Sequence, residues 1–375
     1  FSIVIASISC FGQVAINEYS VSNLSSYLDN YGGEEDWIEL YNTSASSLNI
    51  GGFYLSDKTT NPSKWEIPEG TVIPAYGYLV FWCSGRDEVS GNNYHTNFKL
   101  KQTKNTQEHI VLSDPSGSIL EDIELQKTQL EHSMGKTPNG SGDWKIYTTS
   151  TLGDSNSGAN YLTYAETPVM NLEAGFYEGT QNVSITSGEP NSSIYYTLNG
   201  SLPSEESNSY SGDLTLSGTK IVKAIVVSEN PEILPSFISF NTYFIDENHS
   251  LPVLSTSADE LTVLLNGDQS LRPHGTIEYF DAQGNRKDAG YGEYNKHGQD
   301  SWQFPQRSFD YIARDEMGYH DAINDKLLEY SERESFDLIN FNENVLSIVS
   351  CSSILYDSIS SNGITGIIGP NCSSW

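Results

Sequence analysis

The stretch from Glu35 to Trp82 most constrains how this chain can fold. Trp37 to Tyr41 alternates apolar and polar side chains, which is the two-residue period of a half-buried strand. Further strand-forming runs follow turn-rich segments, ending with the aromatic and β-branched run from Tyr76 to Trp82. Short strands separated by turns in this way predict an all-β sandwich for the first part of the chain.

The same region resembles the lamin-tail domain, which is an immunoglobulin-like sandwich. The matching motifs come in the family's order and are Ile16-Asn17-Glu18, Asp36 to Asn42, Leu55-Ser56-Asp57, Lys64-Trp65, Phe98-Lys99-Leu100, His132 to Gly135 and Trp144. The resemblance implies a sandwich over residues 14–157. It also implies a binding module, because no catalytic set comes with the family.

A second module is predicted over residues 166–246, after a linker at 158–165. The string from Ile194 to Pro203, followed by Tyr210-Ser211-Gly212 and Val222-Lys223-Ala224, resembles the small β-sandwich at the C-terminus of chitobiases and hexosaminidases. Asn199 stands where that family usually has Asp. The resemblance implies an accessory domain rather than a glycosidase, because no βα repeat is present to carry paired catalytic carboxylates.

The stretch from Gly292 to Tyr319 resembles the N-terminal part of the spore-coat CotH-type kinase-like family. The resemblance implies an incomplete α+β kinase-like segment over residues 250–341, in which the basic residue Arg307 would meet a nucleotide phosphate. Many relatives carry Lys there, and Arg binds phosphate as a fork rather than as a point charge. The lobe with the family's metal-binding acids and catalytic base has no counterpart here, so we expect no phosphate transfer from this segment alone.

The two ends of the chain have a different composition from the modules. Residues 1–13 are apolar and end in small and polar side chains, which predicts the remnant of a secretory signal peptide; a first strand of the sandwich is the alternative. Residues 342–375 match no family and are rich in Ser and Ile, which indicates a truncated or frame-shifted reading, with a genuine β-prone tail as the alternative. No run is long and apolar enough to predict a membrane span.

The charge balance bears on partners and cofactors. With 49 acidic and 19 basic side chains, the formal net charge is -30. Such a field repels phosphate backbones and disfavours nucleic acid as a partner. The clustered carboxylates of Glu34, Glu35 and Asp36, together with Glu121-Asp122, are a candidate calcium site, since calcium prefers oxygen ligands. A solvated acidic surface is the alternative. No other cofactor is expected.

One polar cluster is a candidate ligand site. It consists of His297, Asp300 and Arg307, and the alternative is that such side chains only fix a turn by hydrogen bonds. His95, His109 and His132 lack metal-ligand spacing and are expected to be solvated, with His95 in a loop from Gly85 to Asn97. The four cysteines form no paired framework, and Cys83 is expected to be a buried apolar residue.

Two functional hypotheses follow from these features. The first is a secreted, non-catalytic binding or adhesion protein of the extracellular space or cell surface, which contacts polysaccharide or protein through tandem sandwiches and has no catalytic residues. The second is the N-terminal fragment of an extracellular CotH-type kinase-like enzyme. The expected fold class is mainly β in either case: tandem immunoglobulin-like sandwiches followed by an incomplete α+β segment.

Overall fold

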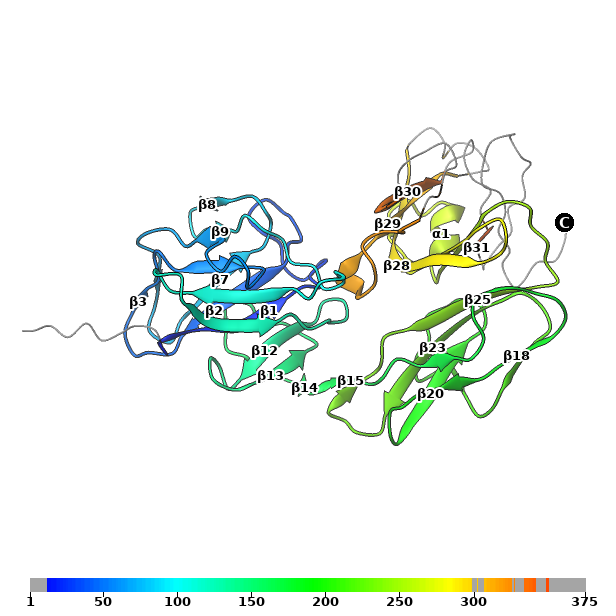
Figure 1. The fold of residues 1–375 in the computed structure, drawn as a ribbon, viewed down its shortest axis with the longest axis horizontal. Coiled ribbons are helices and arrows are strands. Elements are labelled where there is room, and N and C mark those ends of the chain that lie inside the picture. Colours follow the sequence, from blue (N-terminus) through cyan, green and yellow to red (C-terminus); the bar gives the residue numbers. More distant parts are fainter. Residues whose placement is uncertain are drawn as a thin grey trace, which may run out of the picture. The chain divides into compact units, whose positions relative to one another are not determined.

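The computed structural model describes residues 12–298, 302, 307–325, 327, 334–341 and 349–350. The predicted signal-peptide remnant and the unmatched tail therefore lie almost wholly outside the described residues. The chain divides into two compact units, the first over Phe1–Thr163 with Glu316–Gly318, and the second over Tyr164–Asp315 and Tyr319–Trp375 (Figure 1). Both are built mainly from strands, as the sequence predicts.

The largest sheet of the first unit has eight strands in the order β14-β13-β12-β1-β2-β7-β9-β8. Strands β1 and β2 lie in its centre, and the pairs β1–β2, β2–β7 and β12–β13 are antiparallel. The strands are β1 (Val14–Ser20), β2 (Trp37–Asn42), β7 (Tyr78–Trp82), β8 (Glu88–Ser90), β9 (Asn93–His95), β12 (Ser133–Thr137), β13 (Asp143–Tyr147) and β14 (Asn160–Tyr161).

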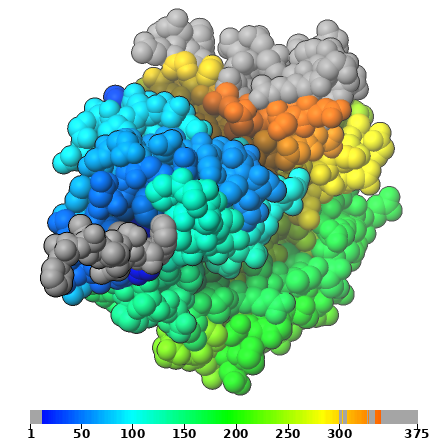
Figure 2. All heavy atoms as spheres, turned by 60° about the vertical axis from the view of Figure 1, so that its left-hand side comes forward, coloured from blue at the N-terminus to red at the C-terminus, as the bar shows by residue number. Residues whose placement is uncertain are grey.

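A second sheet of the first unit has the order β11-β10-β4-β5, and a short pair joins β3 to β6. The Trp65 ring of β5 meets the Phe81 ring of β7 edge to face, with centroids 6.0 Å apart, so side chains of the two sheets share one core. In the space-filling view this unit, coloured blue to cyan, is closely packed (Figure 2). The remaining strands are β3 (Leu48–Asn49), β4 (Tyr54–Ser56), β5 (Trp65–Glu66), β6 (Val72–Ile73), β10 (His109–Ser113) and β11 (Ile119–Glu124).

The predicted loop from Gly85 to Asn97 is wrong, because this segment forms the short hairpin β8–β9. Strand β9 also pairs in parallel with β7. Gly91 turns the hairpin with a φ of +63°, a conformation that suits glycine. Strands of three residues are too short to display the two-residue alternation from which the other strands were predicted.

The second unit contains a sandwich around a five-stranded sheet of order β17-β25-β23-β20-β21, with the short pairs β18–β22, β16–β19 and β15–β24 beside it. Its core includes Val183, Leu216, Val222 and Tyr243. The strands are β15 (Thr163–Tyr164), β16 (Val169–Met170), β17 (Gly175–Tyr177), β18 (Gln181–Val183), β19 (Ile185–Thr186), β20 (Ser192–Thr197), β21 (Asn208–Ser209), β22 (Leu214–Leu216), β23 (Lys220–Ser228), β24 (Ile233–Leu234) and β25 (Ser239–Ile245).

The same unit holds a six-stranded sheet of order β30-β29-β28-β27-β26-β31, with one short helix packed near β28. The buried Lys223 ammonium of β23 donates to the carbonyl of Ser257 at 3.3 Å, so this sheet and the sandwich share buried polar contacts. The elements are β26 (Val253–Ala258), α1 (Leu261–Asn266), β27 (His274–Phe280), β28 (Arg286–Lys296), β29 (Phe309–Ala313), β30 (Leu338–Phe341) and β31 (Val349–Ser350). A 3-10 turn, Asp315–Met317, follows β29, and its last two residues are grouped with the first unit.

Within the described residues, no helix has the length and apolar character needed to cross a membrane. Cys83 is buried and unpaired, as expected.

Candidate functional site: a polar cleft in the second unit

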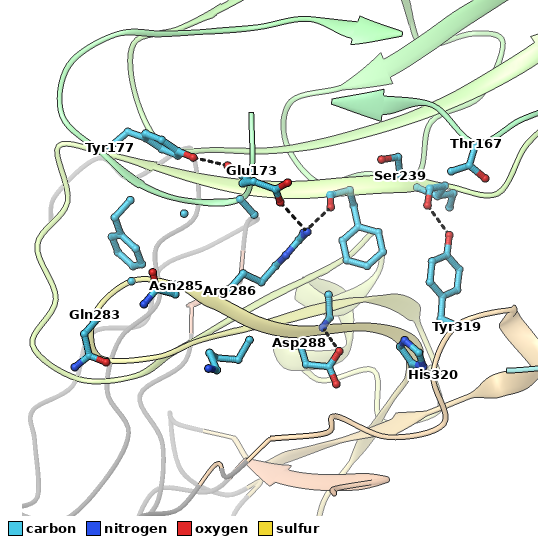
Figure 3. A pocket seen from close by; sticks show the side chains of 18 residues that line it. Thr167, Glu173, Tyr177, Ser239, Gln283, Asn285, Arg286, Asp288, Tyr319 and His320 are labelled. Atoms are coloured by element: carbon cyan, nitrogen blue, oxygen red, sulfur yellow. Dashed lines mark hydrogen bonds and ion pairs between the residues drawn. The ribbon is translucent and has the colours of Figure 1, made fainter. Parts of the chain in front are cut away.

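An open cleft with a volume of about 880 Å³ lies in the second unit, between the sandwich and the β27–β28 hairpin (Figure 3). One wall is the hairpin turn from Asp281 to Asn285. The Asp281 carboxylate accepts hydrogen bonds from the backbone N–H groups of Gln283, at 3.0 Å, and Asn285, at 2.9 Å. Gly284 supplies the positive φ of +82° that closes the turn. These contacts fix the turn and leave the side chain of Gln283 exposed.

The opposite wall is formed by β17 and the residues before it. Gly175 of β17 makes an isolated antiparallel bridge with Asn285, which joins the two walls at one end of the cleft. The Phe176 ring stacks on Phe244, with centroids 4.3 Å apart, and this aromatic contact anchors the wall to the sheet behind it. The Tyr177 hydroxyl donates to the carbonyl of Glu173 at 2.6 Å, and 90% of the Glu173 side chain is exposed.

The Arg286 side chain contacts residues of both walls of the cleft. Its Nη1 donates to Asn241 Oδ1 at 2.7 Å and to Glu278 Oε1 at 3.1 Å, and its Nη2 lies 3.8 Å from Glu173 Oε2. Glu278 is buried, and Thr242 donates to its other oxygen. Burial raises the pKa of Glu278, although the positive charge of Arg286 lowers it in part. The positive charge of Arg286 is therefore largely balanced by Glu278 and Glu173, and the cleft is not a strong anion site.

The far end of the cleft is closed by the segment after β29. The Tyr319 hydroxyl donates to the carbonyl of Ile238 at 2.6 Å, and burial raises its pKa, so it stays protonated. Asp288 accepts hydrogen bonds from the backbone N–H of Asn324, at 2.5 Å, and of Ala289, at 2.8 Å. The neighbouring His320 is exposed. Both hydrogen-bond donors and hydrogen-bond acceptors thus line an open cleft beside aromatic rings. This arrangement is suited to a polar, uncharged ligand.

Sequence reasoning did not find this cleft. None of its lining residues was a candidate, because each is an ordinary surface or turn residue until the hairpin meets β17. The Asp-Ala-Gln-Gly-Asn turn from Asp281 to Asn285 was the available signal, since it predicts a tight hairpin with exposed polar side chains.

The candidate ligand residues His297 and Arg307 do not line the cleft, but both lie beside Trp302. The Trp302 indole N–H donates to the carbonyl of His297 at 3.0 Å, and the Arg307 guanidinium lies 5.4 Å from the Trp302 ring centroid. His297 Nδ1 is 2.9 Å from Asp310 Oδ1, and Arg307 donates to the carbonyl of Leu265 at the end of α1. Asp300, the third member, lies outside the described residues. The proposed ligand site therefore stays a prediction.

The candidate calcium ligands lie at the start of β2. Glu34 is exposed, whereas Glu35 accepts a hydrogen bond from Lys99 Nζ at 3.0 Å and lies 3.7 Å from Arg86 Nη2. The backbone carbonyl of Asp36 accepts from the N–H of Cys83 at 2.7 Å. Over the part of the chain that the structure describes, no three acidic, histidine or cysteine side chains converge as metal ligands. Glu35 is placed to balance two cationic side chains, and calcium binding here remains a prediction.

The expectation of solvated histidines is wrong for His95. Its ring is fully buried, with Nδ1 3.0 Å from Ser84 Oγ and Nε2 2.7 Å from Asn30 Oδ1. These contacts tie the loop before β2 to strand β9. His132 is also largely withdrawn from water, and burial lowers its pKa to about 4. No local sequence pattern indicates this burial, because the groups around each histidine come from distant segments.

Comparison with known families supports two of the three resemblances. Residues 9–127 match the model of the Lamin Tail Domain, and residues 172–233 match that of the Chitobiase/beta-hexosaminidase C-terminal domain. A search of curated proteins found no match. The chain thus combines two β-sandwich modules of recognised type. The kinase-like resemblance of residues 250–341 rests on the sequence motifs alone.

Proposed function

We propose that this chain is a secreted, non-catalytic binding or adhesion protein, and that the cleft beside Arg286 holds one chain end or loop of an extracellular polysaccharide. The cleft is the observation that carries the proposal. It is open, it is bordered by aromatic side chains, and its exposed groups include a carboxylate, an amide and an imidazole. Sugar hydroxyls both donate and accept hydrogen bonds, so they match such a mixed lining.

The modular architecture is consistent with this role. Both recognised modules are β-sandwiches, a fold that hosts many binding functions, and the fold by itself does not specify the ligand. The strongly acidic composition favours a neutral partner over an anionic one, since like charges repel. A protein partner is the second possibility within the same function.

Binding of neutral polysaccharides to the full chain tests the proposal. Xylan, soluble chitin fragments and a β-glucan are immobilised, and binding is measured by surface plasmon resonance. We expect at least one to bind, and Gln283→Ala and Glu173→Gln to weaken that binding by about tenfold each, which is about 1.4 kcal/mol. The matched control is Glu205→Gln, an exposed residue of the same unit that does not line the cleft.

Two results would contradict the proposal. One is binding that the cleft variants leave unchanged, which would move the site elsewhere. The other is the absence of polysaccharide binding together with magnesium-dependent binding of ATP, which would favour the kinase-like alternative for residues 250–341.

A further inference from the structure

Two glutamates of the first unit face each other in the interior. Glu18 of β1 and Glu39 of β2 are paired in the antiparallel register, and both are fully buried. The register shifts between Ile16 and Glu18, so Asn17 occupies a β-bulge and its side chain is buried beside the two acids. A bulge on a central strand re-aims side chains, and here it gathers two carboxylates and an amide at one point.

The segment over residues 148–157 covers this pair. Glu18 accepts hydrogen bonds from the Thr151 N–H at 2.9 Å and from the Thr151 hydroxyl at 2.5 Å, and Glu39 accepts from the Gly153 N–H at 2.6 Å. Asn156 completes the contact: its amide donates to the carbonyl of Asn17 at 3.1 Å. The segment therefore docks on the acids through two backbone N–H groups and the Thr151 hydroxyl.

Only uncharged donors meet the two carboxylates from the other elements around them. Ser133 of β12 donates to Glu18 at 2.5 Å, and Asn17 donates to Glu39 at 2.9 Å. Among the described residues, neither acid forms an ion pair with a lysine, arginine or histidine. The other ionisable groups that face them are Asp154 on the covering segment and the phenols of Tyr27 and Tyr78.

Two buried negative charges side by side, without a cation, strongly disfavour a second ionisation. Glu18 has three hydrogen-bond donors and Glu39 has two, so Glu18 is the better placed to carry a charge. Burial raises the pKa of both acids; that of Glu39 rises to about 8, and the charges of Glu18 and Asp154 add to its shift. The pair is accordingly expected to hold a proton at neutral pH.

We propose that Glu18 and Glu39 form a proton-controlled latch for residues 148–157. With a proton on the pair, the segment stays docked; when both carboxylates are ionised, they take up water and the segment leaves. The segment directly precedes the short strand β14 and the chain crossing at residue 163 into the second unit. Its two ends continue into β13 and β14, which pair with each other, so its release opens a loop of the first unit while these strands stay paired.

Hydrogen exchange of the full chain between pH 6 and pH 9 tests the latch, with rates corrected for the intrinsic effect of pH. We expect the protection of peptides covering 148–157 to fall by about tenfold per pH unit from pH 6 to about pH 8 and to level off above it, because only in this range does the docked pair hold a proton that the released pair has lost. Peptides from β10 and β11 should keep their protection, which reports that the sandwich remains folded.

Three variants make the test specific. Glu39→Gln, which cannot ionise, should remove the pH dependence. Asp154→Asn should make the fall in protection level off at a lower pH, because without the repelling charge the docked pair ionises more readily. Glu124→Gln, an exposed acid on β11, should behave as the wild type. Equal protection at all pH values in the wild type, or an unchanged transition in both Glu39→Gln and Asp154→Asn, would overturn the proposal. If Glu39→Gln fails to fold, Asp154→Asn alone decides it.

Discussion

Each unit buries glutamate on a central strand, but the two units stabilise it differently. In the second unit, Glu278 lies 3.1 Å from the Arg286 guanidinium, a cation that neutralises it. In the first unit, Glu18 and Glu39 lie together and receive only hydroxyl and amide donors. A paired charge fixes two elements together at all ordinary pH values, whereas an unpaired acid pair is sensitive to protons. The first arrangement is suited to a rigid cleft and the second to a switch.

Removing the Arg286 guanidinium, the cation that pairs with Glu278, should have the largest effect on stability. Arg286→Ala should lower the unfolding free energy of the second unit by about 3–5 kcal/mol, because Glu278 would remain buried without a partner. Urea denaturation followed by circular dichroism measures this. The double variant Arg286→Ala with Glu278→Gln should recover part of the loss, and no recovery would mean that the arginine acts mainly through packing.

The pH dependence of stability should differ between the units. The folded-state pKa of Glu39, about 8, lies above its ordinary value of 4.5, so the unfolded chain releases the proton first as the pH rises. The stabilisation is complete below pH 4.5 and is lost as the pH rises through about 8, at about 1.4 kcal/mol per unit. Melting curves from pH 5 to 9 should show this fall for the first unit and a shallower one for the second, where Arg286 compensates. If the melting temperatures of the two units fell equally steeply with pH, the proposed difference between their buried glutamates would be contradicted.

Adding a methyl group beside the segment that covers Glu18 and Glu39 should have a smaller effect on stability. A Cβ on Gly135 would lie 2.6 Å from Asn156 Nδ2 and 3.0 Å from the Tyr147 ring. Gly135→Ala should therefore cost about 1–3 kcal/mol, because the Asn156 contact that seats residues 148–157 must shift. Gly218→Ala, where a Cβ meets nothing within 4 Å, is the control in the second unit. Thermal unfolding that leaves both variants equal to wild type would show that the covering segment adapts freely.

Calcium should have the smallest effect. Glu35 already faces Lys99 and Arg86, so added calcium should raise the melting temperature of the first unit only slightly or not at all. The exposed Lys99–Glu35 pair itself is worth no more than about 0.5 kcal/mol, which Lys99→Ala would measure. A rise of about ten degrees with calcium would show that Glu34, Glu35 and Asp36 bind the ion after all.

The strands of the lamin-tail region were predictable because their signal is local. Trp37 to Tyr41 is rich in strand-forming residues, and β10 and β11 flank the turn residues Asp114 to Gly117. The half-buried strand predicted for Trp37 to Tyr41 is wrong in one respect: β2 lies in the centre of the sheet and is buried on both faces. The hairpin β8–β9 was missed because three-residue strands carry no period. His95 was expected in water, although its partners Asn30 and Ser84 come from separate segments that only the sheet brings together.

The sequence by itself determined a chain of β-sandwich modules, because alternation, turn residues and family motifs are written in consecutive residues. It also contained the motif residues Asn17, Glu18 and Glu39, without saying what they face. Only the tertiary structure decided that the two glutamates lie side by side in the interior and that the Asp281 to Asn285 turn meets β17 to form a cleft. The physical reason is that the desolvation of a side chain and its hydrogen-bond partners depend on which distant segments become neighbours in the fold. A pattern of consecutive residues does not show which segments these are.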